Sequence, residues 1–140
     1  MNQTPRAFVA EPPRAHANQS SLFGPMNPRI TRWQGRRVWL IGASSGIGEA
    51  TALALHARGA QVQLSARNTQ ALQAVASRMS GQGQVWPLDV TDASAVQQVA
   101  DAILAQGPLD LVLYCAGHYR EMRAQSLDLA DLRRHLDINY

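Results

Sequence analysis

Lysine is absent from this sequence of 140 residues, and cysteine occurs only once, as Cys115. Without lysine the chain cannot form a P-loop, because that loop needs a Gly-Lys pair for its phosphates. A single cysteine excludes an internal disulfide framework and fits a reducing compartment. No stretch approaches the ~20 apolar residues of a membrane span. The N-terminus also lacks the apolar core of a secretory signal, so we expect a cytoplasmic protein without a membrane partner.

Positive charge is modest and comes from arginine alone, with 13 basic residues against 10 acidic ones and a net charge of +3. The arginines are scattered and form only the pairs Arg36-Arg37 and Arg133-Arg134, which predicts no nucleic-acid partner. His56, His118 and His135 lack the spacing typical of metal ligands, so we expect no metal site. The length and the apolar content of 46% fit one ordinary domain.

Residues 1–34 differ in composition from the remainder of the chain. Most of the prolines lie there, and no apolar period is present. Such a segment cannot bury enough surface to offset its ordering entropy. We therefore predict a disordered tail over residues 1–34 and a nucleotide-binding domain over residues 35–140. Translation from Met26 instead of Met1 is an alternative, since only a short leader would then precede the first strand.

From Trp33 onward, apolar runs of strand length alternate with helical patterns. The predicted strands are 37–41, 61–66, 84–88 and 109–114, and the predicted helices are 46–58, 70–79, a third that starts at Thr91 or Asp92 and ends before Gly107, and a last one after Asp128. The first helix has Ile47, Ala50, Thr51, Ala54 and Leu55 on its apolar face, and the last has Leu129, Leu132 and Leu136. Pro87 suits an edge strand. This alternation predicts an α/β fold with a doubly wound parallel sheet in the order 3-2-1-4.

The segment Val38–Gly48, VWLIGASSGIG, joins an apolar strand to a glycine-rich turn and a helix. That order creates a phosphate site, because the turn and the helix N-terminus present free N–H groups and positive dipole charge. We expect Gly42 to leave the strand through dihedrals that other residues avoid, and Gly46 to admit a pyrophosphate. Gly48 would let the helix lie close on the strand. The spacing G-x-x-x-G-x-G differs from the G-x-G-x-x-G fingerprint.

The run IGASSGIG resembles the T-G-x-x-x-G-[I/L]-G turn of the short-chain dehydrogenases/reductases, with Ile41 in place of the threonine. The similarity extends over about residues 36–140. It implies a Rossmann-like fold that is truncated after strand 4 and its following helix. It also implies a nicotinamide cofactor and oxidoreduction of a small carbonyl or alcohol substrate. The cofactor-binding residues implied at the turn are Gly42, Ser44, Ser45, Gly46, Ile47 and Gly48.

The ends of strands 2 and 3 carry the next candidate residues. An NAD site would place an acid after strand 2 to bind the ribose 2′-hydroxyl, but this chain has Ala66 and Arg67. A guanidinium can bind a 2′-phosphate, so we expect NADP(H) rather than NAD(H), with a solvated surface arginine as the alternative. After strand 3, Asp89-Val90-Thr91 resembles the family's D-V-[T/S] element. The resemblance implies that Asp89 and Val90 border the adenine, whereas by itself Asp89 could be an ordinary turn carboxylate.

After strand 4 the family usually has N-A-G, and this chain has Cys115-Ala116-Gly117. The resemblance implies that Ala116 and Gly117 bind the cofactor. A thiol cannot reproduce the asparagine's bracing hydrogen bonds, so Cys115 is interpreted as a small core residue. Further on, Leu136–Tyr140 resembles L-x-x-N-x-x-G. Asn139 then matches the catalytic asparagine that holds a water in the family's proton relay.

The family's catalytic Y-x-x-x-K pair cannot occur in a lysine-free chain. In the mechanism that the resemblance implies, the tyrosine transfers a proton while the lysine lowers its pKa. We therefore predict that the 140 residues alone are inactive. The chain is interpreted as the N-terminal part of a longer enzyme. Alternatives are a non-catalytic nucleotide-binding module or other nucleotide chemistry such as methyl transfer, although no acid follows strand 2. An oligomeric complete enzyme is compatible with the sequence, and substrate and reaction direction stay open.

Overall fold

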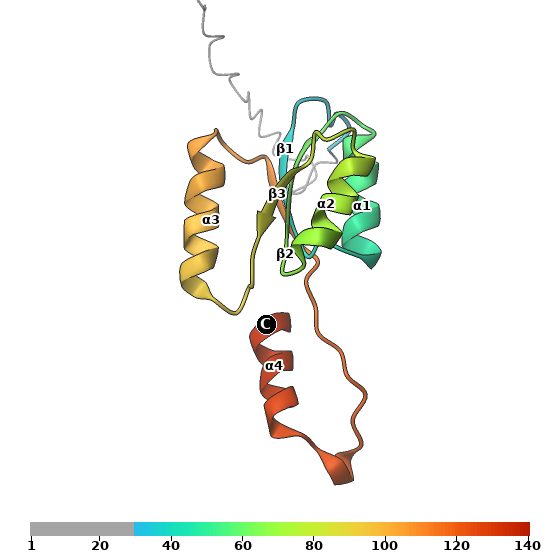
Figure 1. Cartoon of the computed structure of the whole chain (residues 1–140), viewed down its shortest axis with the longest axis vertical. Coiled ribbons are helices and arrows are strands. Elements are labelled where there is room, and N and C mark those ends of the chain that lie inside the picture. Colours follow the sequence, from blue (N-terminus) through green and yellow to red (C-terminus); the bar gives the residue numbers. More distant parts are fainter. Residues whose placement is uncertain (1–29) are drawn as a thin grey trace, which may run out of the picture. The chain divides into compact units, whose positions relative to one another are not determined.

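The computed structural model describes residues 30–140, so the predicted tail lies outside the described residues except for positions 30–34. Strands and helices alternate along the described chain (Figure 1). The strands are β1 (Arg37–Ile41), β2 (Gln61–Ala66), β3 (Gln84–Pro87) and β4 (Leu111–Tyr114). The helices are α1 (Gly46–His56), α2 (Thr69–Arg78), α3 (Ala93–Ala105) and α4 (Leu129–Asn139), with the short 3-10 helix η1 (Ala124–Ser126) before α4.

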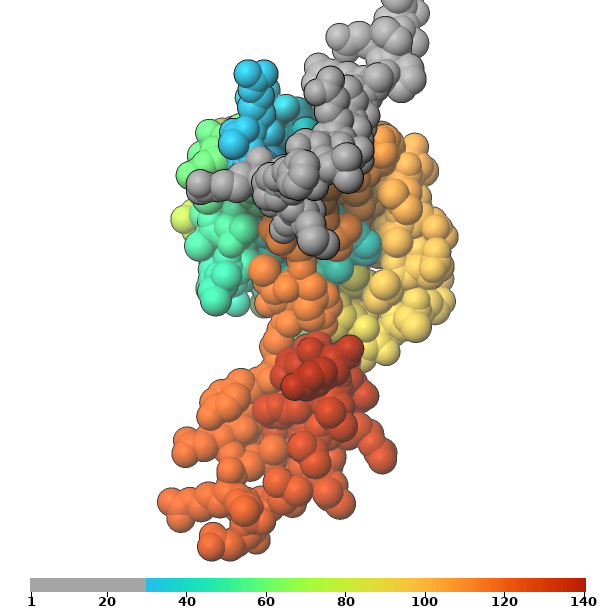
Figure 2. All heavy atoms as spheres, turned by 180° about the vertical axis from the view of Figure 1, so that it is seen from behind, coloured from blue at the N-terminus to red at the C-terminus, as the bar shows by residue number. Residues whose placement is uncertain are grey.

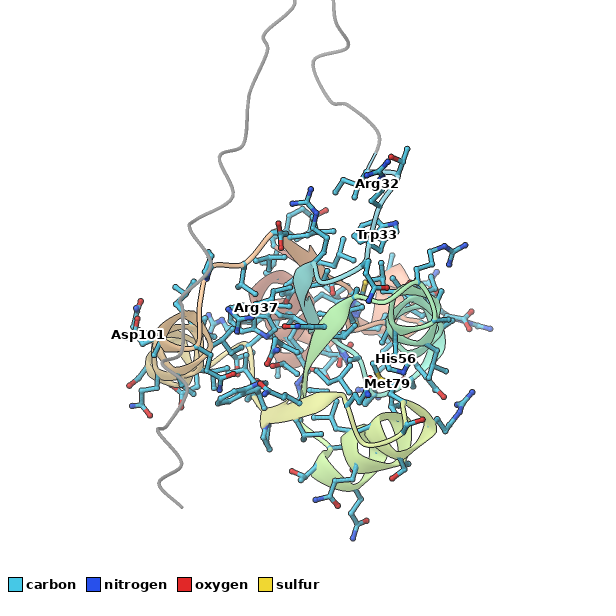
Figure 3. All side chains as sticks on the ribbon, turned by 90° about the horizontal axis from the view of Figure 1, so that it is seen from above. Arg32, Trp33, Arg37, His56, Met79 and Asp101 are labelled. Atoms are coloured by element: carbon cyan, nitrogen blue, oxygen red, sulfur yellow. The ribbon has the colours of Figure 1, made fainter. Side chains whose placement is uncertain are left out.

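The four strands form one parallel sheet in the order β3-β2-β1-β4, which confirms the predicted order. Helices α1 and α2 cover one face of the sheet, and α3 covers the other (Figures 1 and 3). Strand β3 lies at one edge of the sheet and ends at Pro87. Proline has no N–H to donate to a neighbouring strand, so it suits this edge position. The carboxyl ends of all four strands therefore meet along one side of the sheet.

Side chains of β1 alternate between two apolar cores, as the two-residue period of a strand demands. Val38 and Leu40 are fully buried in the core beneath α1 and α2. Trp39 and Ile41 are buried in the second core, where they pack with Ile103 of α3. Trp33 is partly buried against the first core, so packing on the domain begins before residue 35.

The predicted apolar face of α1 was wrong except at Leu55. The buried residues of this helix are Gly48, Ala52 and Leu55, whereas Ile47 is 81% exposed. The reason is the close approach of Gly48 to the strand–turn junction, which selects the face with the smallest side chains for contact with the sheet. The hydrophobic period alone could not reveal this, because it weighs large apolar residues more than small ones.

Helix α2 packs as its helical period requires. Leu72, Val75 and Ala76 of this helix and Met79 at its C-cap are all buried. Strand β4 begins at Leu111 instead of residue 109. In the turn before it, the carbonyl oxygens of Gly107 and Pro108 accept hydrogen bonds from the Arg37 guanidinium. Helix α1 ends at His56, two residues before the predicted end, and β3 ends at Pro87, one residue early.

The segment after β4 extends beyond the carboxyl ends of the strands before α4 returns toward them (Figures 1 and 2). The phenolic hydroxyl of Tyr114 donates to the carbonyl oxygen of Ile138, which connects β4 to the end of α4. The three leucines predicted as the apolar face of α4 are exposed, and Asp131 and Ile138 are buried instead. Among residues 30–140, no helix has the length and apolar character needed to traverse a bilayer.

Candidate functional site

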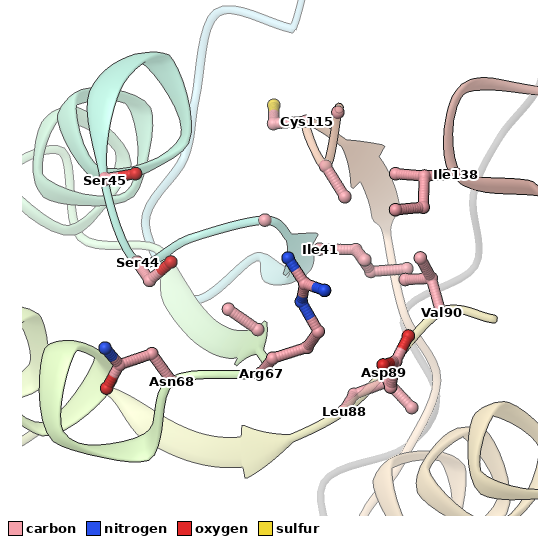
Figure 4. A pocket seen from close by; sticks show the side chains of 14 residues that line it. Ile41, Ser44, Ser45, Arg67, Asn68, Leu88, Asp89, Val90, Cys115 and Ile138 are labelled. Atoms are coloured by element: carbon pink, nitrogen blue, oxygen red, sulfur yellow. The ribbon is translucent and has the colours of Figure 1, made fainter. Parts of the chain in front are cut away.

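A hollow of about 260 Å³ opens at the edge of the sheet where the strands end (Figure 4). The residues that line it come from the turn after each strand and from the end of α4. They are Ile41, Gly42, Ser44, Ser45, Ala66, Arg67, Asn68, Leu88, Asp89, Val90, Cys115, Ala116, Gly117 and Ile138. The chain continues from β1 to β2 and β3 on one side, whereas β4 lies on the other side of β1. The strand order therefore reverses between β1 and β4, and parallel α/β sheets bind ligands at such a switch point.

The glycine turn is tightly constrained where it leaves β1. Gly42 has φ +91°, and a Cβ at this position would lie 2.3 Å from the backbone nitrogen of Ala116. Its own N–H donates to the carbonyl oxygen of Ser65 at 2.7 Å. Gly46 has φ +57° but faces open space, and a Cβ on it would meet no atom within 4 Å. The turn thus combines close backbone contact at Gly42 with a free approach at Gly46.

The N-terminus of α1 differs from those of the other three α-helices in the described chain. Asn68, Asp92 and Asp128 each cap their helix by accepting a backbone N–H with a side-chain oxygen. Ser45, which precedes α1, makes no such side-chain hydrogen bond. Backbone donors in the first turn of α1 are therefore left without a side-chain acceptor, next to a hollow lined by Ser44 and Ser45. This is an anion-binding arrangement.

Arg67 and Asp89 follow β2 and β3 along the chain, and both line the hollow. Figure 4 shows the Arg67 guanidinium extending into the space between Ser44 and the Asp89-Val90 pair. Asp89 accepts hydrogen bonds from the backbone N–H of Thr91 at 3.0 Å and from its hydroxyl at 2.8 Å. These two bonds, followed by the positive charge of Arg67, lower the pKa of Asp89 below its ordinary value. Both bonds use Oδ1, so Asp89 is a turn carboxylate that also faces the hollow.

Asn139 braces the loop that follows β4. Its Oδ1 accepts the backbone N–H of His118 at 2.8 Å, and its Nδ2 donates to the His118 carbonyl oxygen at 2.9 Å. This reciprocal pair resembles a single rung of backbone hydrogen bonding between the loop and α4. Cys115 is half-buried, packs against the first core and also lines the hollow, so it is more than a core residue.

Most of the residues predicted for the cofactor site line the hollow together: Gly42, Ser44, Ser45, Arg67, Asp89, Val90, Ala116 and Gly117. Gly46, Ile47, Gly48 and Asn139 do not line it. Six lining residues were not among those predicted for the cofactor site: Ile41, Ala66, Asn68, Leu88, Cys115 and Ile138. Asn68 could have been found from its position directly after Arg67, whereas Ile138 enters only through the tertiary return of α4.

A family model described as short chain dehydrogenase matches residues 36–140. The chain is 34% identical over 125 residues to dehydrogenase/reductase SDR family member 7 of Mus musculus, which covers 77% of this chain and 37% of that protein. It is 36% identical over 139 residues to 2-keto-3-deoxy-L-fuconate dehydrogenase of Xanthomonas campestris, covering 90% of this chain and 45% of that protein. The chain therefore spans less than half the length of these two relatives.

Solved structures give the same result. A short-chain type dehydrogenase/reductase from Mycobacterium marinum superposes with a TM-score of 0.68 at 34% identity, covering 75% of this chain and 44% of that one. A hydroxysteroid dehydrogenase from Escherichia coli superposes with a TM-score of 0.70 at 27% identity, covering 77% of this chain and 47% of that one. The parallel sheet and its helices are thus those of the first part of such enzymes.

Proposed function

Because the chain belongs to the short-chain dehydrogenase/reductase family, whose members use NAD(P), we propose that residues 30–140 bind NADP(H) in the hollow at the strand ends. The observation that carries the proposal is the uncapped N-terminus of α1, which opens on the hollow that the Arg67 guanidinium enters. Free backbone donors suit the pyrophosphate, and the guanidinium suits a further phosphate. No carboxylate follows β2 to repel that phosphate.

Each part of the cofactor has residues of matching chemistry. The turn Gly42–Gly48 would hold the pyrophosphate, with Gly46 giving the closest backbone approach and the Ser44 and Ser45 hydroxyls within the same turn. Arg67 would bind the 2′-phosphate. Asp89 and Val90 would border the adenine, because Oδ2 of Asp89 keeps an acceptor for an exocyclic amine. Ala116 and Gly117 would line the path toward the nicotinamide.

The complete enzyme would oxidise an alcohol or reduce a carbonyl, with the nicotinamide supplying hydride transfer. Asn139 would contribute to the proton relay through its main-chain carbonyl oxygen, because both polar groups of its side chain are bonded to His118. In the mechanism that the family resemblance implies, proton transfer requires a tyrosine–lysine pair, and the 140 residues contain no lysine. These 140 residues would therefore bind the nucleotide without turning over a substrate.

Calorimetry with NADPH and NADH on the purified chain tests the proposal. NADPH should bind more tightly, and Arg67→Asp should lower its affinity roughly 10- to 100-fold, the worth of one charge-assisted contact, while sparing NADH. Arg123→Asp is the matched control, because it makes the same charge change at an exposed residue that does not line the hollow. Equal affinities for both cofactors would contradict the NADP(H) preference, and binding of neither would contradict the site.

A further inference from the structure

Three potential metal ligands meet outside the nucleotide hollow. His118 comes from the loop after β4, and Asp131 and His135 lie one turn apart on α4. His118 Nε2 is 2.9 Å from Asp131 Oδ1, and His135 Nε2 is 3.4 Å from Asp131 Oδ2. One ligand atom from each residue lies within 4.8 Å of the other two. The spacing of histidines in the sequence predicted no metal site, because the third ligand is a carboxylate and the first joins the others only in the fold.

Asp131 is the buried member of this cluster. Its side chain is only 6% exposed, and its Oδ2 has no hydrogen-bond partner. Burial of a carboxylate oxygen without a partner costs folding free energy, so this oxygen favours a ligand that would pair with it.

The neighbouring imidazole cannot satisfy that oxygen. His135 Nε2 already accepts the backbone N–H of Arg120 at 3.2 Å, so the nitrogen presents a lone pair and not a proton. His135 Nε2 and the anionic Oδ2 of Asp131 therefore lie 3.4 Å apart without a proton between them. A cation there would pair with Oδ2 and would take the His135 lone pair from the backbone N–H of Arg120, an exposed residue whose N–H could then donate to water. The nearest positive group, the Arg120 guanidinium, lies 4.0 Å from Oδ1, the other oxygen.

We propose that His118, Asp131 and His135 form a binding site for a divalent transition metal, with Zn²⁺ as the preferred ion. Two imidazoles and one carboxylate are ligands that Zn²⁺ accepts, whereas Mg²⁺ and Ca²⁺ prefer oxygen donors throughout. Tetrahedral bonds of about 2.0–2.1 Å place ligand atoms about 3.3 Å apart, and one ligand atom from each of the three residues already lies within 4.8 Å of the other two. When the metal binds, it replaces the proton that His118 and Asp131 share. It also replaces the backbone N–H of Arg120 as the partner of His135 Nε2. A water completes the fourth position.

The metal would join the loop after β4 to α4. Asn139 makes the same connection through the backbone of His118, so the two contacts flank one loop residue. None of the three ligands lines the nucleotide hollow, so the two sites share no residue. Among residues 30–140, Arg120 is the one basic group besides the two histidines within ion-pair range of Asp131. Its side chain is 62% exposed and also pairs with Asp128, so it can turn toward Asp128 and leave room for the ion.

Titration of the chelator-treated full chain with Zn²⁺ alone tests the proposal. Calorimetry should give one Zn²⁺ per chain, and the melting temperature should rise because the ion binds only the folded state. His118→Ala, His135→Ala and the isosteric Asp131→Asn should each weaken binding roughly tenfold or more. His56→Ala is the matched control, since His56 is a half-buried histidine on α1 outside the cluster, and it should leave binding unchanged.

Co²⁺ gives a second readout, and in the unsubstituted chain this readout does not depend on the stability of any variant. Bound in a four-coordinate site, Co²⁺ should show the strong visible absorption typical of tetrahedral coordination, and this absorption should vanish in Asp131→Asn. Binding of Zn²⁺ that is unchanged in all three ligand variants would overturn the proposal. So would a Co²⁺ spectrum identical to that of the hydrated ion, because the cluster would then be a hydrogen-bonded contact without metal.

Discussion

Gly48, in the first turn of α1, lies directly against the carbonyl oxygen of Gly42 at the end of β1. A Cβ on Gly48 would be 2.0 Å from that oxygen and 2.9 Å from its carbon. Both contacts are with backbone, which cannot move aside as a flexible side chain would. The contact sets the distance between α1 and the sheet, and so it also sets which face of α1 is buried and where its N-terminus meets the hollow.

Gly48→Ala should therefore destabilise the fold by about 1–3 kcal/mol or more, the typical cost of overpacking. Chemical denaturation followed by circular dichroism measures this free energy of unfolding. Gly46→Ala is the comparison, because Gly46 lies two residues earlier and faces open space. That variant incurs only the left-handed strain of about 1–2 kcal/mol, and should instead weaken nucleotide binding. If both variants lost the same stability, the contact between Gly48 and Gly42 would not control packing.

A buried hydrogen bond joins the two central strands. Trp39 Nε1 on β1 donates to Ser65 Oγ on β2 at 2.9 Å, and Ser65 is fully buried. Ser65→Ala should cost about 1–3 kcal/mol of unfolding free energy, because it leaves the indole N–H without an acceptor. Ser77→Ala removes an exposed hydroxyl that bonds the Gln73 carbonyl and should cost far less. A similar loss in both variants would mean that the Trp39–Ser65 bond contributes little.

The pH dependence of stability should include a contribution from Asp89. Its pKa in the folded state is lowered below 3.8 by the backbone N–H and then the hydroxyl of Thr91. A lowered folded pKa stabilises the protein above the ordinary value, and this stabilisation is lost as the pH falls through the folded pKa. Carbon NMR titration of the Asp89 carboxyl measures the value directly. Thr91→Ala should raise it only partway toward 3.8, because the larger backbone contribution stays. No change, or full recovery, would contradict this order of causes.

The sequence predicted the sheet order and most of the hollow because both follow from local patterns. Strand ends of a parallel sheet meet on one side, so residues such as Arg67 and Asp89 could be placed together without coordinates. Helix caps at Asn68, Asp92 and Asp128 were likewise predictable, since each side chain bonds a backbone group two or three residues ahead. The division into tail and domain stays a prediction.

What the sequence could not give depends on contacts between distant elements. The buried face of α1 follows from the Gly42–Gly48 contact and not from the apolar period. The role of Asn139 as a brace for His118, and the meeting of His118 with Asp131, require the return of α4 to the strand ends. Leucine spacing predicted an apolar face for α4 that is exposed among the described residues, because the buried side of this helix carries Asp131 instead.

Self-association should occur through β4. This strand pairs with β1 on one side, and no strand of residues 30–140 pairs with its other side. Val112 and Tyr114 on it are about half exposed, at 49% and 50%. An apolar strand edge with unpaired backbone groups favours strand addition from another copy, and a lysine on such an edge opposes it.

Val112→Lys should therefore raise the concentration at which the chain self-associates by roughly tenfold or more, equivalent to ~1.4 kcal/mol. Analytical ultracentrifugation over a dilution series measures that concentration. Leu129→Lys is the matched control, because it adds the same charge and removes an apolar side chain that is 73% exposed, but on α4 instead of a strand edge. If Leu129→Lys were equally effective, association would reflect general surface hydrophobicity and net charge. A chain that stays monomeric at all concentrations before any substitution would contradict the role of the β4 edge altogether.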